Sequence, residues 1–172
     1  MASPCSFRNA MCSRRASYST RSLQMTDGRN AMTNSQSVVP MIAYADAVAA
    51  IDWLSDAFGF RERERITGAD GTIVHAELET NEHGGIVMLA TPSPDYEGPR
   101  RHSDQCERSR AWLSVPWVVD GVLVYIEDVD AHFARSKLKG ARILSEPEDG
   151  PPARRYRVED LEGHRWMFMQ HP

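Results

Sequence analysis

The sequence lacks several features that mark common classes of protein. It has no run of eighteen or more apolar residues, so it predicts no membrane-spanning helix. Among its 172 residues it has only three cysteines, Cys5, Cys12 and Cys106, and their spacing fits neither a disulfide framework nor a zinc knuckle. We therefore expect a reducing compartment, the cytoplasm. No G-x-G-x-x-G or P-loop pattern occurs, so no motif supports nucleotide binding.

Charge is divided unevenly along the chain. Residues 1–37 hold five arginines and one aspartate, a net charge of +4, which leaves −8 for residues 38–172 because the whole chain carries −4. An acidic body argues against a nucleic-acid-binding surface, which needs clustered positive charge. We expect residues 1–37 to be a disordered or non-native N-terminal tail. The alternative is a mitochondrial-type targeting segment, since this stretch is rich in Ser and Arg.

The body contains two similar copies of one pattern. In the first copy a strand over 38–45 precedes Asp46, whose carboxylate can cap a helix, and Gly59 ends that helix. Three strands follow, over 60–67, 72–80 and 86–90. In the second copy the same order is repeated: strand 121–126, cap Asp128, stop Gly140, and strands 141–145, 155–158 and 165–170.

This duplication predicts an α+β fold. Two βαβββ modules, about 38–92 and 119–172, would form curved mixed sheets around a concave cavity, with the helices outside. The linker, about 93–118, is rich in proline, and its residues 103–113 predict a short helix. Trp112 and Trp117 flank Pro116 in this linker, where they can form a lid over the cavity, a partner surface or simple core cover.

Two stretches carry a resemblance to a known family. They are Ala57-Phe58-Gly59-Phe60 after the first helix and the ending Asp160-Leu161-Glu162-Gly163-His164-Arg165-Trp166. With the duplicated modules, they make the body similar to the vicinal oxygen chelate superfamily, also called the glyoxalase/bleomycin-resistance/dioxygenase family. Within it, the chain resembles a glyoxalase-like subgroup without an assigned reaction. The resemblance implies a homodimer.

The resemblance also implies where a divalent metal would be held. Counting from the caps and the last turn places the family's ligand positions at Val39, Gly121, Met167, and either Met88 or Leu89. None of these side chains suits a hard or borderline divalent ion, which needs carboxylate or imidazole ligands. We therefore expect no metal site at these positions and no cofactor.

What remains of the family's site is its cavity. Side chains alternate between the two faces of a strand, so every second residue counted from these positions should face the cavity. The residues placed there are mostly apolar, with one phenol and one guanidinium. We expect it to bind a small organic molecule, although the same residues could fill a collapsed interior. The predicted ligand-binding residues are Met41, Met88, Leu123, Tyr125, Arg165, Met167, Met169 and Trp117.

Four side chains are candidates for acid–base catalysis, namely His75, Glu77, Tyr125 and His164. Histidine exchanges protons near neutral pH, but a histidine paired within a strand or a turn has a simpler structural role. The sequence thus leaves three functions open. The protein binds a small molecule without a metal, or it is a lyase, isomerase or dioxygenase-type enzyme with a non-standard site, or it is a structural or regulatory module without a ligand.

Overall fold

The computed structural model of the chain describes residues 38–81, 84–115 and 121–171. The chain divides into two units, residues 1–34 and 35–172, and all the described residues belong to the second unit. The predicted tail, residues 1–37, lies outside the described residues, as does Trp117. Within the described part, none of the helices is both long enough and apolar enough to cross a membrane.

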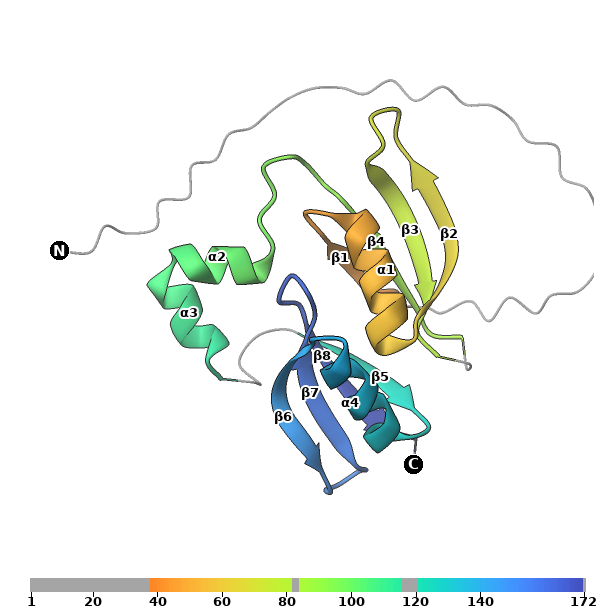
Figure 1. The fold of residues 1–172 in the computed structure, drawn as a ribbon, viewed down its shortest axis with the longest axis vertical. Coiled ribbons are helices and arrows are strands. Elements are labelled where there is room, and N and C mark those ends of the chain that lie inside the picture. Colours follow the sequence, from red (N-terminus) through yellow and green to blue (C-terminus); the bar gives the residue numbers. More distant parts are fainter. Residues whose placement is uncertain (1–37, 82–83, 116–120, 172) are drawn as a thin grey trace, which may run out of the picture. The chain divides into compact units, whose positions relative to one another are not determined.

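The first module contains four strands and one helix. In chain order these are β1 (Met41–Ala43), α1 (Ala47–Phe58), β2 (Arg61–Thr67), β3 (Ile73–Glu79) and β4 (Ile86–Ala90). The sheet has the strand order β1-β4-β3-β2, in which β1 is parallel to β4 and the other pairs are antiparallel (Figure 1).

The second module repeats this arrangement. It contains β5 (Val122–Ile126), α4 (Val129–Leu138), β6 (Arg142–Glu148), β7 (Arg155–Glu159) and β8 (Arg165–Gln170). The order is β5-β8-β7-β6, and only β5 and β8 are parallel. The predicted α+β fold of two βαβββ modules is confirmed.

Two local predictions were wrong. The linker holds two short helices, α2 (Pro99–Gln105) and α3 (Glu107–Leu113), instead of one helix over 103–113. They are separated at Cys106, whose extended backbone, with φ −125° and ψ 111°, breaks the helical path. Strand β6 also continues through Pro147 to Glu148, past the end expected at residue 145. Proline is tolerated there because β6 is an edge strand.

The predicted caps begin and end the first helix. Asp46 Oδ1 accepts a hydrogen bond from the backbone N–H of Ala49 at 3.0 Å, and Asp128 Oδ1 does the same for Ala131 at 2.9 Å. Gly59 has φ +73°, the left-handed conformation that glycine adopts without strain. The two helices therefore begin where the duplicated aspartates stand.

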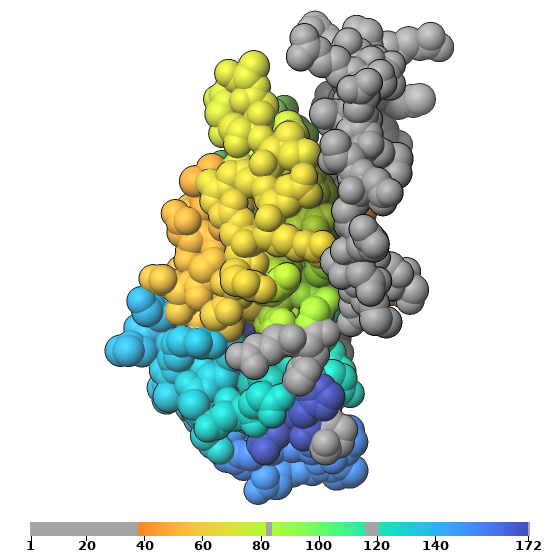
Figure 2. All heavy atoms as spheres, turned by 90° about the vertical axis from the view of Figure 1, so that its right-hand side faces the viewer, coloured from red at the N-terminus to blue at the C-terminus, as the bar shows by residue number. Residues whose placement is uncertain are grey.

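Aromatic residues from both modules share one core. Phe58 of α1 contacts Trp166 and Phe168 of β8, with ring centroids 5.7 Å and 4.8 Å apart. Phe60 also packs against Trp166. Helices α1 and α4 contact each other, and in Figure 2 the orange residues of the first module lie against light-blue residues of the second. The helix-bearing sides of the sheets thus build the core.

The second module holds α1 at both of its ends. At the N-terminus, the Glu162 carboxylate accepts hydrogen bonds from the backbone N–H groups of Ala45, at 2.8 Å, and Asp46, at 3.0 Å. At the C-terminus, Arg135 donates to the carbonyls of Ala57 and Phe58. A negative charge at the first end and a positive charge at the second both suit the helix dipole.

The turn before β8 is organised by one buried carboxylate. Asp160 Oδ1 accepts the backbone N–H groups of Glu162, Gly163 and His164 at 2.9–3.0 Å. Its Oδ2 accepts Tyr44 Oη at 2.7 Å and Trp166 Nε1 at 3.1 Å. Burial, followed by the nearby charge of Asp160, raises the pKa of Tyr44 well above its ordinary value. The ending that carried the family resemblance therefore joins the two modules.

Candidate functional site

Helices α1 and α4 pack against one face of the sheets, and we call the opposite face of each sheet the helix-free face. In the first sheet Met41 and Met88 are direct register partners on this face, whereas Leu89, beside Met88 in sequence, is buried in the core. The choice between Met88 and Leu89 for the family's last-strand position therefore falls on Met88. In the second sheet Leu123 pairs with Met167, and Tyr125 pairs with Met169.

A cavity of about 590 Å³ adjoins the edge strand β1. One wall comes from β1, including Met41, and another comes from the linker segment of α2 and α3. The starts of β5 and β8 supply the remainder, including Arg165. The lining is mostly apolar and aromatic, with a few polar groups: Pro40, Met41, Ile42, Ala43, Tyr96, Glu97, Pro99, His102, Ser109, Trp112, Leu113, Gly121, Val122, Gly163, His164 and Arg165.

Arg165 is a structural as well as a lining residue. It is buried, and it forms an ion pair with the buried Glu159 at 3.3 Å. Its guanidinium also donates to the carbonyls of Leu113 and Val115, which ties the end of the linker to β8. Its Nε has no hydrogen-bond partner among the described residues. Arg165 therefore shapes the cavity wall first, although its Nε remains open to another acceptor.

The predicted ligand-binding residues do not all meet in one place. Met41 and Arg165 line the cavity of about 590 Å³, whereas Tyr125 lines a separate cavity of about 340 Å³ near the C-terminal end of α1. Three others lie on the helix-free faces and line neither of these cavities: Met88, Leu123 and Met167. Met169, in the second sheet, is buried.

The four catalytic candidates lie on three different elements. His75 and Glu77 are neighbours on the helix-free face of β3, with Nε2 3.6 Å from Oε1. His164 Nε2 lies 2.8 Å from the carbonyl of Ala43, in the turn before β8. Tyr125 stands on β5, with its ring beside His171. The structure thus brings together only His75 and Glu77.

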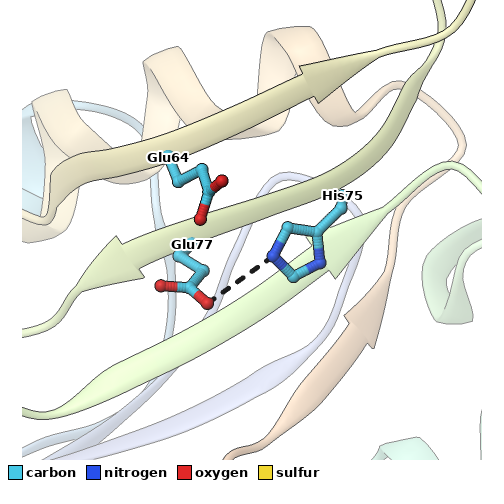
Figure 3. A group of neighbouring side chains, drawn as sticks. All are labelled: Glu64, His75 and Glu77. Carbon is cyan, nitrogen blue, oxygen red and sulfur yellow. Dashed lines mark ion pairs between the residues drawn. The ribbon is translucent and has the colours of Figure 1, made fainter. Parts of the chain in front are cut away.

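Glu64 of β2 joins this pair, and sequence reasoning missed it. Its register partner is Glu77, and one side-chain ligand atom from each of Glu64, His75 and Glu77 lies within 4.8 Å of the others. Figure 3 shows the three side chains gathered on one side of the two strands. The sequence of β2 alternates Arg and Glu, and this alternation does not tell which of its residues lies opposite Glu77 on β3.

The linker residues of the cavity were also missed, apart from Trp112. Tyr96, His102 and Ser109 line the cavity wall formed by the linker segment. The only sequence signal for this wall was the pair of tryptophans around Pro116. Trp112 lines the cavity while remaining 58 % exposed, as a residue at a cavity rim does.

Comparisons with known proteins agree with this architecture. The family model described as Glyoxalase/Bleomycin resistance protein/Dioxygenase superfamily matches residues 37–168. The chain belongs to this superfamily. An uncharacterized protein of Mycobacterium tuberculosis, Rv0887c, is 33 % identical over 132 residues, which is 76 % of this chain and 72 % of the relative.

Solved structures share the fold. TioX from Micromonospora sp. ML1 is 38 % identical and has a TM-score of 0.57, with 80 % of this chain and 100 % of TioX covered. TnmS3, an antibiotic binding protein from Streptomyces sp. CB03234, has a TM-score of 0.54 over 80 % of this chain and 98 % of TnmS3. At 19 % identity, TnmS3 supports the fold alone. The superfamily is thus established and the reaction is unassigned.

Proposed function

We propose that this protein binds a small, largely apolar organic molecule in the cavity beside β1. The observation that carries the proposal is the size and chemistry of that cavity. Its volume of about 590 Å³ lies within the range of small-molecule sites. Apolar side chains dominate its walls, and a few polar groups, including Ser109 and His102, can orient a ligand.

Met41 and Trp112 are the side chains through which a ligand would be held. Met41 is 80 % exposed, so a monomer leaves a flexible apolar side chain open to contact. Methionine adapts to irregular ligand shapes, and an indole ring offers a wide flat surface. Because the family's ligand positions hold no metal-binding side chains, we propose that this binding needs no metal.

The test is a thermal-shift screen against aromatic antibiotics and small keto compounds, followed by calorimetry on any compound that stabilises the protein. We expect Met41→Lys and Trp112→Ala each to weaken binding roughly tenfold, since each removes on the order of 1–2 kcal/mol of apolar contact. The matched control is Leu138→Lys, because Leu138 is 84 % exposed on α4 and lines neither described cavity of about 590 or 340 Å³. EDTA should leave the affinity unchanged.

Two results would overturn this proposal. If no compound stabilises the protein, a ligand-free structural or regulatory role is favoured. If Met41→Lys and Leu138→Lys affect binding equally, the ligand lies elsewhere.

A second candidate is an enzyme of the same superfamily, and the neighbouring His75 and Glu77 favour it. Their 3.6 Å separation is longer than a hydrogen bond, so the pair would have to close on a substrate before it could transfer a proton. Turnover of a keto compound, lost in Glu77→Gln and retained in Met41→Lys, would favour catalysis over binding.

We also propose a homodimer in the cytoplasm. The exposed Met41, Leu123 and Tyr125 on the helix-free faces support a second copy as a cover, and the cysteine spacing supports a reducing compartment. Light scattering coupled to gel filtration tests the dimer, and a Leu123→Glu variant that stays dimeric would place its interface elsewhere. Cell fractionation tests the compartment.

A further inference from the structure

We propose that Glu64, His75 and Glu77 form a binding site for a divalent transition metal ion on the helix-free face of the first sheet. The three side chains come from adjacent antiparallel strands, β2 and β3. They offer one imidazole and two carboxylates, a ligand set that suits zinc and related first-row ions. The site is distinct from the family's expected positions, because it uses the two strands that those positions do not.

The geometry requires only a small adjustment. One ligand atom from each side chain lies within 4.8 Å of the other two. Ligand atoms bound to one ion at about 2.0–2.2 Å stand on the order of 3–4 Å apart. Side-chain rotation can close that difference, since Glu64 is exposed and His75 and Glu77 are half-buried. Figure 3 shows the three groups turned toward one another.

The strand register gives the second argument. Glu64 and Glu77 are direct partners across the β2–β3 pair, and like charges in that position repel each other. A divalent cation between them would convert this repulsion into two attractive contacts. His75 lies two residues before Glu77 on the same strand, so alternation places its ring on the same face.

The guanidinium of Arg63 also lies near Glu77, and it offers a way to test the metal site. Arg63 Nε lies 3.9 Å from Glu77 Oε2, a loose ion pair with Arg63 half exposed. If Glu77 serves only this ion pair, the cluster is an ordinary charged edge of the sheet. If it is a metal ligand, Arg63 competes with the ion for the same carboxylate. Removal of Arg63 should then tighten metal binding, an effect that a purely structural role of Glu77 does not produce.

An ion held by only these three side chains would have one or more coordination positions open to solvent. These positions face away from α1, because the core side of β3 carries the buried Ala76 and Leu78. Water or a donor atom of a bound molecule could occupy them. The metal site goes beyond the proposed small-molecule function, and it is tested with the metal alone.

The experiment is a calorimetric titration of the full-length, tag-free, chelator-treated protein with zinc, repeated with cobalt to record its visible absorption spectrum. We expect one ion per chain, and a loss of affinity of roughly tenfold or more in His75→Leu, Glu64→Gln and Glu77→Gln. The matched control is Glu79→Gln, which removes a carboxylate from the same strand and outside the cluster. Arg63→Gln should raise the affinity.

Two outcomes would overturn the proposal. One is the absence of stoichiometric zinc binding in the wild-type protein and in Arg63→Gln. The other is a control, Glu79→Gln, that weakens zinc binding as much as the cluster variants do. Because Arg63→Gln predicts a gain, the test does not depend on variants that merely fail to fold. Failure of this site leaves the cavity proposal untouched, since that proposal is tested in EDTA.

Discussion

Replacement of Asp160 by asparagine tests how far one carboxylate joins the two modules. In the wild-type protein its two oxygens accept five hydrogen bonds and are fully buried. Asparagine can keep Oδ1 for the three backbone donors, but its NH₂ group then faces Tyr44 and Trp166. The tyrosine hydroxyl can turn and accept a hydrogen bond, whereas the indole N–H can only donate.

Asp160→Asn should therefore leave one buried N–H unsatisfied, at about 1–3 kcal/mol, and weaken the remaining bonds by removing their charge. We expect a total loss of about 3 kcal/mol in the free energy of unfolding, out of the 5–15 kcal/mol typical of a domain. Urea denaturation at pH 7 measures it, with an unchanged m-value as the condition for comparison.

The control for this prediction is Asp70→Asn. Asp70 accepts hydrogen bonds from Thr72 N and Oγ1 in an exposed hairpin turn, so its replacement should cause no measurable loss of stability. The reasoning is refuted if Asp160→Asn costs less than about 1 kcal/mol, or if the two variants are equally stable.

Three further predictions concern the same junction. Burial and the charge of Arg135 lower the pKa of His132 to about 4 in the fold, so the unfolded chain takes up the proton first as pH falls. Stability should drop by about 3 kcal/mol between pH 6.5 and 4, and denaturation curves of His132→Gln should show a shallower pH dependence. Arg135→Met should cost about 1–2 kcal/mol in urea denaturation, because the last carbonyls of α1 lose their charged donor and keep only Ser136 Oγ at Ala57 and His132 Nε2 at Phe58. Glu162→Gln should cost about 1–2 kcal/mol at low salt, because it removes the charge and leaves one of the two backbone N–H groups facing an amide NH₂ group. The charge–dipole part should be screened in 1 M NaCl, so a loss of the same size at both salt concentrations would contradict it.

The local features of the fold could be predicted from the sequence because short-range chemistry decides them. Asp46 and Asp128 stand at fixed positions before amphipathic stretches, and their carboxylates cap the helices within four residues of the chain. Gly59 marks the end of α1 for the same local reason. The helix break at Cys106 was missed, since nothing in its neighbours opposes helix formation strongly.

The site was only partly predictable because its contacts join distant residues. Glu162 reaches the first turn of α1 across more than a hundred residues, and no local pattern announces it. Arg165 lines the cavity of about 590 Å³, and its ion pair with Glu159 depends on strand pairing that alternation does not fix. The position of Glu64 opposite Glu77 depends on a register shift between Glu62 and Glu64.

The two proposed sites are separable because β4 lies between them. The cavity adjoins β1, the metal cluster lies on β3 and β2, and the sheet order is β1-β4-β3-β2. Adjacent strands are about 4.8 Å apart, so β1 and β3 are separated by roughly 10 Å. Met88 of β4 is the register partner of both Met41 and Glu77, and its thioether lies in the interval and suits only soft metal ions. A ligand confined to the cavity therefore does not touch the metal, and only one that extends across Met88 could do so.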